Sequence, residues 1–276
     1  MVWALIAYLA LFTPSSGNMN SLAPKASLIR VANPPQSSNT RAALQLLQLT
    51  NQARAQAGVA PLQLDNGLDA AAQAHANEMA AQGRLEHELP GEAPVMQRLA
   101  AKTTLHLDRT GENVADAASL EQAQEVLMNS PPHRQNLLNS AYNVAGMGVA
   151  RDGDMLYVVQ DFGHSVPAYS AGAAEARISA RVNDLRAQAR LPELQRFDSV
   201  AVRQSACSMA RADSLKAGTS RARYVLRYAN SIADAVPADV AVAIADPAVR
   251  ALSVGACYAR TATYPGGVYW VTLLFN

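Results

Sequence analysis

The chain has 276 residues, enough for about two domains at roughly 150 residues each. Half of its residues are hydrophobic and 16% are charged, with 23 Lys and Arg against 22 Asp and Glu, so the composition is globular and nearly neutral. This balance and an aromatic content of 5% argue against a nucleic-acid-binding protein. Two cysteines exclude a disulfide-dense scaffold and a cysteine-based zinc finger.

The first residues predict an exported protein. Residues 2–12 form an apolar run that is too short for a bilayer span of about 20 residues and suits the core of a signal peptide. No Lys or Arg precedes Lys25, so a weak anchor or a buried first element is the alternative. Residues 18–40 are rich in Pro and Ser and predict a linker. We therefore expect residues 1–17 to direct the protein to the periplasm, the cell envelope or the exterior.

The folded body is expected to begin near residue 41 with helices. Apolar residues at helical spacing predict one helix over residues 41–57 and another over residues 66–82. Asp65 or Asn66 can cap the second helix, and Gly83 ends it.

A shorter helix and a hairpin complete this first part. Residues 120–128 predict a third helix, and Ser130-Pro131 is typical of an N-cap followed by the first residue of a short helix. Residues 144–150 and 155–162, separated by an Asp-Gly turn, predict an antiparallel hairpin. Helices followed by strands indicate an α+β domain.

After residue 172 the same pattern starts again. Residues 51–57 are echoed by residues 183–189, and the hairpin segment 146–151 is echoed by residues 255–260. We interpret this as an internal duplication. All five histidines precede residue 165, so any imidazole chemistry belongs to the first copy.

The duplication also places the two cysteines. Cys207 falls on the second helix of the copy and Cys257 on its first hairpin strand. In an exported protein a disulfide between them would close a loop of about 50 residues and stabilise the fold by roughly 3–4 kcal/mol. The alternative is two free buried thiols that behave as small hydrophobic residues.

Seven motifs in order resemble a known family, the CAP superfamily, also called SCP, which comprises cysteine-rich secretory proteins, antigen 5 and pathogenesis-related 1 proteins. The resemblance covers about residues 41–165 and is strongest to the compact bacterial branch. It implies an α-β-α sandwich, secretion and a shallow cleft lined by His and Glu, with residues 172–276 as a degenerate second copy. The motifs are Asn51-x-x-Arg54, Pro61-Leu62-x-Leu64-Asp65, Ala74-His75-Ala76, an isolated His87, Gly111-Glu112-Asn113-Val114-Ala115, Ser130-Pro131-Pro132-His133-Arg134-x-Asn136-Leu137-Leu138 and Tyr157-Val158-Val159-Gln160-x-Phe162.

On the matching positions the cleft residues are His87, Glu112 and His133. Two imidazoles and one carboxylate are the ligand set of an open zinc site, so zinc or another divalent metal is the expected cofactor. Glu112 is expected in a loop, and His133 in the first turn of the helix capped by Ser130, where the helix dipole keeps its ring neutral. The alternative is a hydrogen-bonded polar cluster that ties loops to the core. The family's second acidic residue is replaced by Asn129-Ser130, so a three-residue site is the most that the resemblance implies.

The other histidines are interpreted as structural. His75 lies on the apolar stripe of the second helix and is expected to be a core histidine with satisfied hydrogen bonds. His106 and His164 carry no motif and are expected at the solvated surface. Asn51 and Arg54 are expected to satisfy buried backbone and acidic groups.

Three functions from different classes remain. The preferred one is a secreted or envelope protein that binds a lipid or other small apolar ligand, a divalent metal or an extracellular partner. The alternatives are a metal-dependent hydrolase that uses His87, Glu112 and His133, and a purely structural envelope module. No Gly-x-Ser-x-Gly or His-Glu-x-x-His motif occurs, which favours binding over catalysis.

Overall fold

The computed structural model describes residues 38–216, 218 and 221–276. The chain divides into two units, residues 1–36 and residues 37–276, and the second unit contains every element described below. The predicted export segment and residues 18–37 of the predicted linker lie outside the described residues. Within the described part of the chain, no helix combines the length and apolar character needed to cross a membrane.

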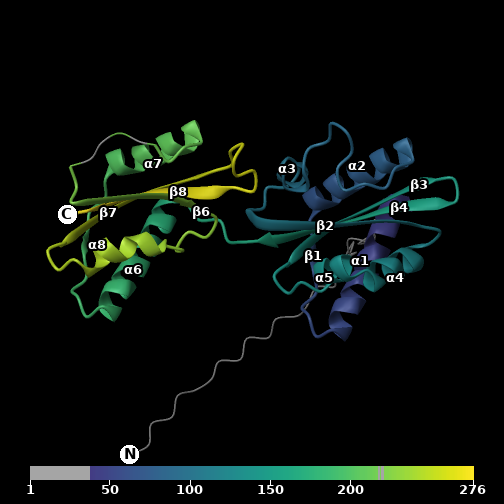
Figure 1. The fold of residues 1–276 in the computed structure, drawn as a ribbon, viewed down its shortest axis with the longest axis horizontal. Helices are drawn as coiled ribbons and strands as arrows, with labels where there is room; N and C mark the ends of the chain where they lie inside the picture. The colour runs from purple at the N-terminus through teal and green to yellow at the C-terminus, as the bar shows by residue number, and fades with distance from the viewer. Residues whose placement is uncertain (1–37, 217, 219–220) are drawn as a thin grey trace, which may run out of the picture. The chain divides into compact units, whose positions relative to one another are not determined.

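The first half of the second unit, residues 38–165, contains a four-stranded mixed sheet (Figure 1). Strand β1 pairs in parallel with β3, whereas β4 pairs antiparallel with both β3 and β2. The predicted hairpin is confirmed, and the long strand β2 was not predicted. In order across the sheet the strands are β1 (Gln63–Leu64), β3 (Val144–Asp152), β4 (Met155–Ser165) and β2 (Leu107–Ala117).

Helices cover both faces of this sheet (Figure 1). On β4, Val158 packs with the cluster that includes α1 and α4, whereas its neighbour Val159 packs with α2, because successive side chains of a strand point to opposite faces. The predicted α-β-α sandwich is therefore present here. The helices are α1 (Ser38–Gln56), α2 (Asn66–Gln82), α3 (Val95–Ala100), α4 (Leu120–Asn129) and α5 (Pro131–Leu137).

The ends of α2 follow the predicted capping. The Asp65 side chain accepts a hydrogen bond from the Leu68 amide at 2.9 Å, and Gly83 adopts the left-handed conformation with φ of 61°. These two residues satisfy backbone groups that the helix itself leaves unpaired.

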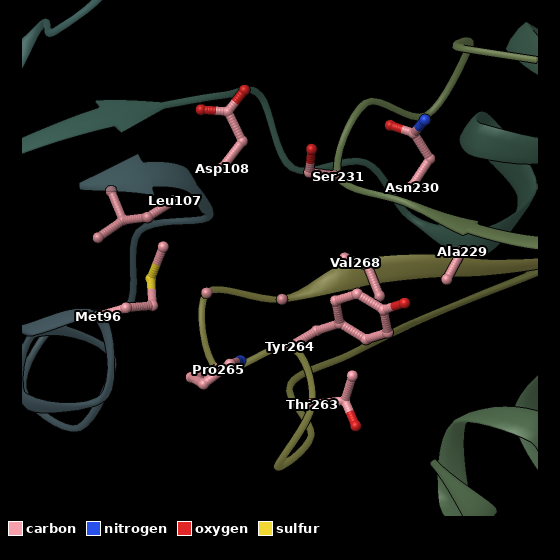
Figure 2. A pocket seen from close by; sticks show the side chains of 12 residues that line it. Met96, Leu107, Asp108, Ala229, Asn230, Ser231, Thr263, Tyr264, Pro265 and Val268 are labelled. Carbon is pink, nitrogen blue, oxygen red and sulfur yellow. The ribbon is translucent and has the colours of Figure 1, made fainter. Parts of the chain in front are cut away.

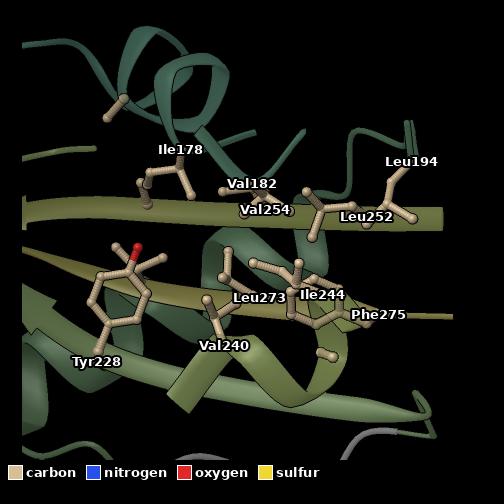
Figure 3. Packing of buried hydrophobic residues seen from close by; sticks show 14 of the residues in the cluster. Ile178, Val182, Leu194, Tyr228, Val240, Ile244, Leu252, Val254, Leu273 and Phe275 are labelled. Carbon is tan, nitrogen blue, oxygen red and sulfur yellow. The ribbon is translucent and has the colours of Figure 1, made fainter. Parts of the chain in front are cut away.

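The second half, residues 166–276, contains a second four-stranded sheet with the same order of strands. Helices α6 and α8 pack in one apolar cluster with the sheet (Figure 3), and α7 packs on the other face. The elements are α6 (Ala171–Gln188), β5 (Gln195–Arg196), α7 (Val200–Ala212), β6 (Tyr224–Asn230), the 3-10 helix η1 (Ala238–Val240), α8 (Ala241–Ala245), β7 (Ala251–Ala259) and β8 (Val268–Phe275).

Each half has a fully buried arginine that hydrogen-bonds to backbone carbonyls. Arg54 of α1 donates to the carbonyls of Ala60 and Leu137 at 2.8 Å, and further to those of Asn139 and Tyr142. Arg186 of α6 donates in the same order to the carbonyls of Pro192, Ile244, Asp246 and Val249. The expectation that Arg54 satisfies buried backbone groups is confirmed.

The predicted disulfide is also present. Cys207 of α7 and Cys257 of β7 are bonded, with their Cα atoms 5.0 Å apart and 50 residues between them in sequence. The bond fastens α7 to the sheet of the second half.

Candidate functional site

Three separate elements bring His87, Glu112 and His133 together. His87 lies between α2 and α3, Glu112 lies near the middle of β2, and His133 lies in the first turn of α5. The His87 Nδ1 atom is 2.9 Å from the Glu112 Oε1 atom, and the two imidazole rings have centroids 6.1 Å apart. The predicted loop position of Glu112 is wrong, because Glu112 pairs with Asp161 across the β2–β4 ladder.

Amide side chains hold α5 against β2. The Asn113 Nδ2 atom donates to the His133 carbonyl at 3.0 Å, and the Asn136 Nδ2 atom donates to the Glu112 carbonyl at 3.1 Å. Ser130 occupies the predicted N-cap position of α5, but its side chain makes no capping hydrogen bond. The position of His133 therefore depends on these amides rather than on Ser130.

A partly buried arginine completes the surroundings of Glu112. Arg98 of α3 contacts the Glu112 Oε2 atom, donates to Glu92 Oε1 at 3.1 Å and donates to the His87 carbonyl at 3.1 Å. Arg98 could not be identified from the sequence, because a single Arg in a short helix carries no motif. His75 is buried and lies 2.8 Å from Glu92 Oε1, which confirms it as a core histidine with satisfied bonds.

The charges around the site keep Glu112 ionised and His133 neutral. Burial opposes ionisation of Glu112, but the hydrogen bond with His87 and the positive charge of Arg98 outweigh it and lower the pKa of Glu112. Burial and the neighbouring His87 lower the pKa of His133. Glu112 is thus a carboxylate, and the nearby His133 imidazole retains a free lone pair.

Asp161 is a second buried carboxyl beneath this site. Its side chain is 1% exposed, and burial together with the charge of Glu112 raises its pKa well above the ordinary value. The sequence contained a signal for it, since Tyr157, Val159 and Asp161 alternate along one face of the predicted strand and Asp161 interrupts an apolar stripe. The hairpin pattern alone does not single out Asp161.

The donors fit a metal held by two imidazoles better than one held by all three residues. Both Glu112 oxygens are already bonded, Oε1 with His87 and Oε2 with Arg98. Among the described residues, no group of three or more His, Cys, Asp or Glu is placed to hold a metal ion. His133 Nδ1 is buried and has no hydrogen-bond partner in the described part of the chain, so this nitrogen is free to coordinate a metal ion.

Of the two histidines expected at the solvated surface, His106 is buried and His164 is partly exposed. His106 is 2% exposed rather than solvated, because its Nε2 atom donates to the Gly267 carbonyl at 2.8 Å and its ring packs edge-on against Tyr258 and Tyr269. His164 is partly buried and lies 2.6 Å from Asp108. Neither histidine is near the His87 cluster.

Comparisons with known proteins agree with the fold of the first half. Residues 47–162 match the model of the family described as CAP, the cysteine-rich secretory protein family. The protein named uncharacterized protein YkwD of Bacillus subtilis (strain 168) is 28% identical over 111 residues, which make up 40% of this chain and 43% of that protein. The chain therefore matches less than half of the length of that curated relative.

Solved structures of other bacterial proteins are also similar to this chain. An extracellular protein containing an SCP domain from Bacillus anthracis str. Ames has a TM-score of 0.43 and 24% identity, covering 49% of this chain and 45% of its own. An outer surface protein from Borrelia burgdorferi has a TM-score of 0.42 and 22% identity, covering 45% of this chain and 92% of its own.

Proposed function

We propose that this protein acts outside the cytoplasm by binding and that its cleft holds a divalent metal through His87 and His133, in the part of the chain, residues 47–162, that matches the CAP family model. The observation that carries this proposal is the 2.9 Å contact between His87 Nδ1 and Glu112 Oε1. A carboxylate that accepts the Nδ1 proton fixes the ring and leaves Nε2 with its lone pair, which is how many metal-binding histidines are oriented.

In this proposal Glu112 orients a ligand and is not itself one. Its two oxygens are committed to His87 and Arg98, and its lowered pKa keeps it ionised. A bound divalent ion would supply Lewis acidity at the cleft. The same commitments make Glu112 a poor general base, which supports binding rather than the alternative metal-dependent hydrolase.

Export is supported by two features of this chain and by the printed descriptions of similar proteins. The apolar run at residues 2–12 suits a signal peptide, and the Cys207–Cys257 disulfide is typical of oxidising compartments. Similar proteins are described as an extracellular protein and an outer surface protein. The site of action we propose is the envelope or the exterior.

We further propose that residues 172–276 are a second, degenerate copy of the domain at residues 41–165. The shared strand order and the matching carbonyl contacts of Arg54 and Arg186 support a duplication. The second copy contains no histidine, so its contribution is to binding or to shape.

Zinc titration of the full chain by calorimetry tests the proposed site. We expect one ion per chain in the wild type and loss of that site in the double variant His87→Ala/His133→Ala. Glu112→Gln keeps the side chain's shape but weakens its hold on His87, and we expect about 10–100-fold lower affinity.

His164→Ala is the matched control, since His164 is a partly buried histidine that lies against Asp108 instead of the cluster. Equal zinc binding by the wild type and the double variant would contradict the proposal and leave the residues as a polar cluster. Unaltered affinity in Glu112→Gln would contradict the orienting role of that residue.

A further inference from the structure

Hydrogen bonds and the packing of the His106 ring against Tyr258 and Tyr269 join the two halves. Each hydrophobic cluster of described residues draws its members from one half only. At the junction, an open cavity of about 410 Å³ lies between Met96 and Leu107 of the first half and Tyr264 and Val268 of the second (Figure 2). The connection here therefore depends on hydrogen bonds and on the His106 ring contacts rather than on a shared apolar core.

Arg260, the residue after β7, makes most of these hydrogen bonds. Its Nη1 atom donates to the carbonyls of Ala100 at 2.6 Å and Thr103 at 2.8 Å, and its Nη2 atom donates to the carbonyl of Leu105 at 2.5 Å. Hydrogen bonds from a charged guanidinium are roughly twice as strong as neutral ones. The three carbonyls belong to the last residue of α3 and the segment that leads into β2, so Arg260 fastens both.

Helix α3 depends on such external support. It has six residues, and its N-cap Pro94 provides no side-chain hydrogen bond. A helix this short is not stable by itself, because the few hydrogen bonds of one or two turns stabilise it by less than the entropy lost in forming the first turn. Its position is therefore set by the groups that hold it, including Arg260 at its end.

The position of α3 also sets the position of Arg98. Arg98 lies in the last turn of α3, two residues before the Ala100 carbonyl that Arg260 holds. Its guanidinium contacts Glu112 and the His87 carbonyl. A shift of α3 would therefore move the counter-charge of Glu112 and the backbone of His87 together.

We propose that Arg260 is a positioning residue for the His87–Glu112 site, so that the second half, which lacks histidine, orders the site of the first half. This inference rests on the proposed function, because the metal site is the feature that Arg260 serves. Two hydrogen bonds to backbone carbonyls assist it: the His106 Nε2 atom donates to the Gly267 carbonyl at 2.8 Å, and the Leu107 amide donates to the Gly266 carbonyl at 3.3 Å.

The test compares Arg260→Met with the wild type in the full chain, by amide hydrogen exchange, imidazole NMR resonances and zinc calorimetry. We expect faster exchange at residues 101–103, whose amides bond back to α3. The Hε1 resonances of His87 and His133 should shift, and zinc affinity should fall about tenfold. Arg260→Lys should restore part of each change, because an ammonium keeps the charge but not the fork of donors.

Arg211→Met is the matched control, since Arg211 is an exposed arginine of α7 whose side chain bonds to Ser208. Unchanged exchange at residues 101–103 in Arg260→Met would overturn the proposal. Faster exchange with unshifted imidazole resonances and unchanged affinity would also overturn it, because the contact would then support only α3.

The imidazole resonances separate this inference from the proposed function. If the wild type bound no zinc, the metal proposal would fail, whereas the resonances would still report whether Arg260 orders the site. A variant counts as folded when the amides of its β3–β4 hairpin exchange at the same rate as those of the wild type. If Arg260→Met did not fold, the same resonances in Arg260→Lys would decide, with a shift expected and its absence contradicting the proposal.

Discussion

The sheets of the two halves share their strand order but carry different chemistry on one face. In the first sheet Glu112 is in register with Asp161, which is in register with Gly146. In the second sheet Arg227 is in register with Thr272, which pairs with a glycine, Gly255.

The two glycines show that these positions correspond. A Cβ atom on Gly146 would lie 2.0 Å from the Leu68 backbone, and one on Gly255 would lie 2.3 Å from the Val202 carbonyl. Leu68 and Val202 lie in the first turns of α2 and α7, so each glycine lets a helix approach its sheet at the same place. Arg227 and Thr272 of the second sheet thus occupy the positions that the buried acids Glu112 and Asp161 occupy in the first sheet.

This difference separates the requirements of the fold from those of the site. Arg54 and Arg186 satisfy carbonyls that have lost water, and an unpaired buried carbonyl is costly whatever the protein does. Glu112 and Arg227 satisfy no such set of buried carbonyls. The charge at this position can therefore differ between the halves while the sheet stays the same. The four predictions below test this separation, beginning with the largest expected effect.

Removal of either buried arginine should destabilise its half strongly. Arg54→Ala and Arg186→Ala each leave four carbonyls without a donor and open a cavity. We expect the free energy of unfolding to fall by about 3–5 kcal/mol in each case, measured by urea denaturation. A large loss for one variant and a negligible loss for the other would break the correspondence between the halves.

Loss of the disulfide should affect only the second half. The bond between Cys207 and Cys257 closes a loop of 50 residues, so Cys207→Ser/Cys257→Ser should lower stability by about 3–4 kcal/mol. Hydrogen exchange should locate the change in α7 and β7. Equal acceleration in α2 and β3 would show instead that the two halves unfold as one cooperative unit.

Asp161→Asn should stabilise the first half at neutral pH. The raised pKa of Asp161 means that the folded state holds its proton more tightly than the unfolded state. This favours folding below the ordinary Asp pKa of about 3.9, and the advantage is lost as pH rises toward the folded pKa. Asn replaces the protonated acid without that penalty.

We expect a gain of on the order of 1–3 kcal/mol at pH 7 and little change at pH 3, measured by denaturation at both pH values. Thr272→Val, at the corresponding position of the second sheet, is the control and should show no such pH dependence. If the gain in the free energy of unfolding of Asp161→Asn were the same at pH 3 and pH 7, the pKa of Asp161 would not be raised by burial beside Glu112.

The smallest effects should come from one serine helix cap in each half. Ser119 accepts a hydrogen bond from the Gln122 amide of α4 at 3.2 Å, and Ser199 accepts one from the Val202 amide of α7 at 3.4 Å. Replacement of either serine by Ala should cost about 1 kcal/mol by thermal denaturation. Replacement by Gly should cost less, and an equal cost for Gly and Ala would argue against a capping role.

Local patterns were enough to predict most of the fold. The ends of α2 followed from Asp65 and Gly83, because capping depends on neighbouring residues alone. The 144–162 hairpin followed from alternation around an Asp-Gly turn. Strand β2 was missed because Gly111-Glu112-Asn113 has the composition of a loop, and it is a strand because β4 offers it a ladder of backbone partners.

The candidate site was predicted in its residues but not in its connections. His87, Glu112 and His133 came from motifs that the chain displays in order. Arg98 and Asp161 reach the same cluster from α3 and β4, and no spacing in the sequence links them to Glu112. The burial of His106 was missed for the same reason, since its partners Tyr258, Gly267 and Tyr269 are more than 150 residues away.

The sequence by itself determined both ends of α2, the β3–β4 hairpin and the types of side chain available for chemistry, because each of these is governed by short-range periodicity and local capping. Only the tertiary structure decided that Arg98 neutralises Glu112 and that Arg260 holds the end of α3. Burial and long-range contacts set which charges are paired, and these arise only when distant segments exclude water together.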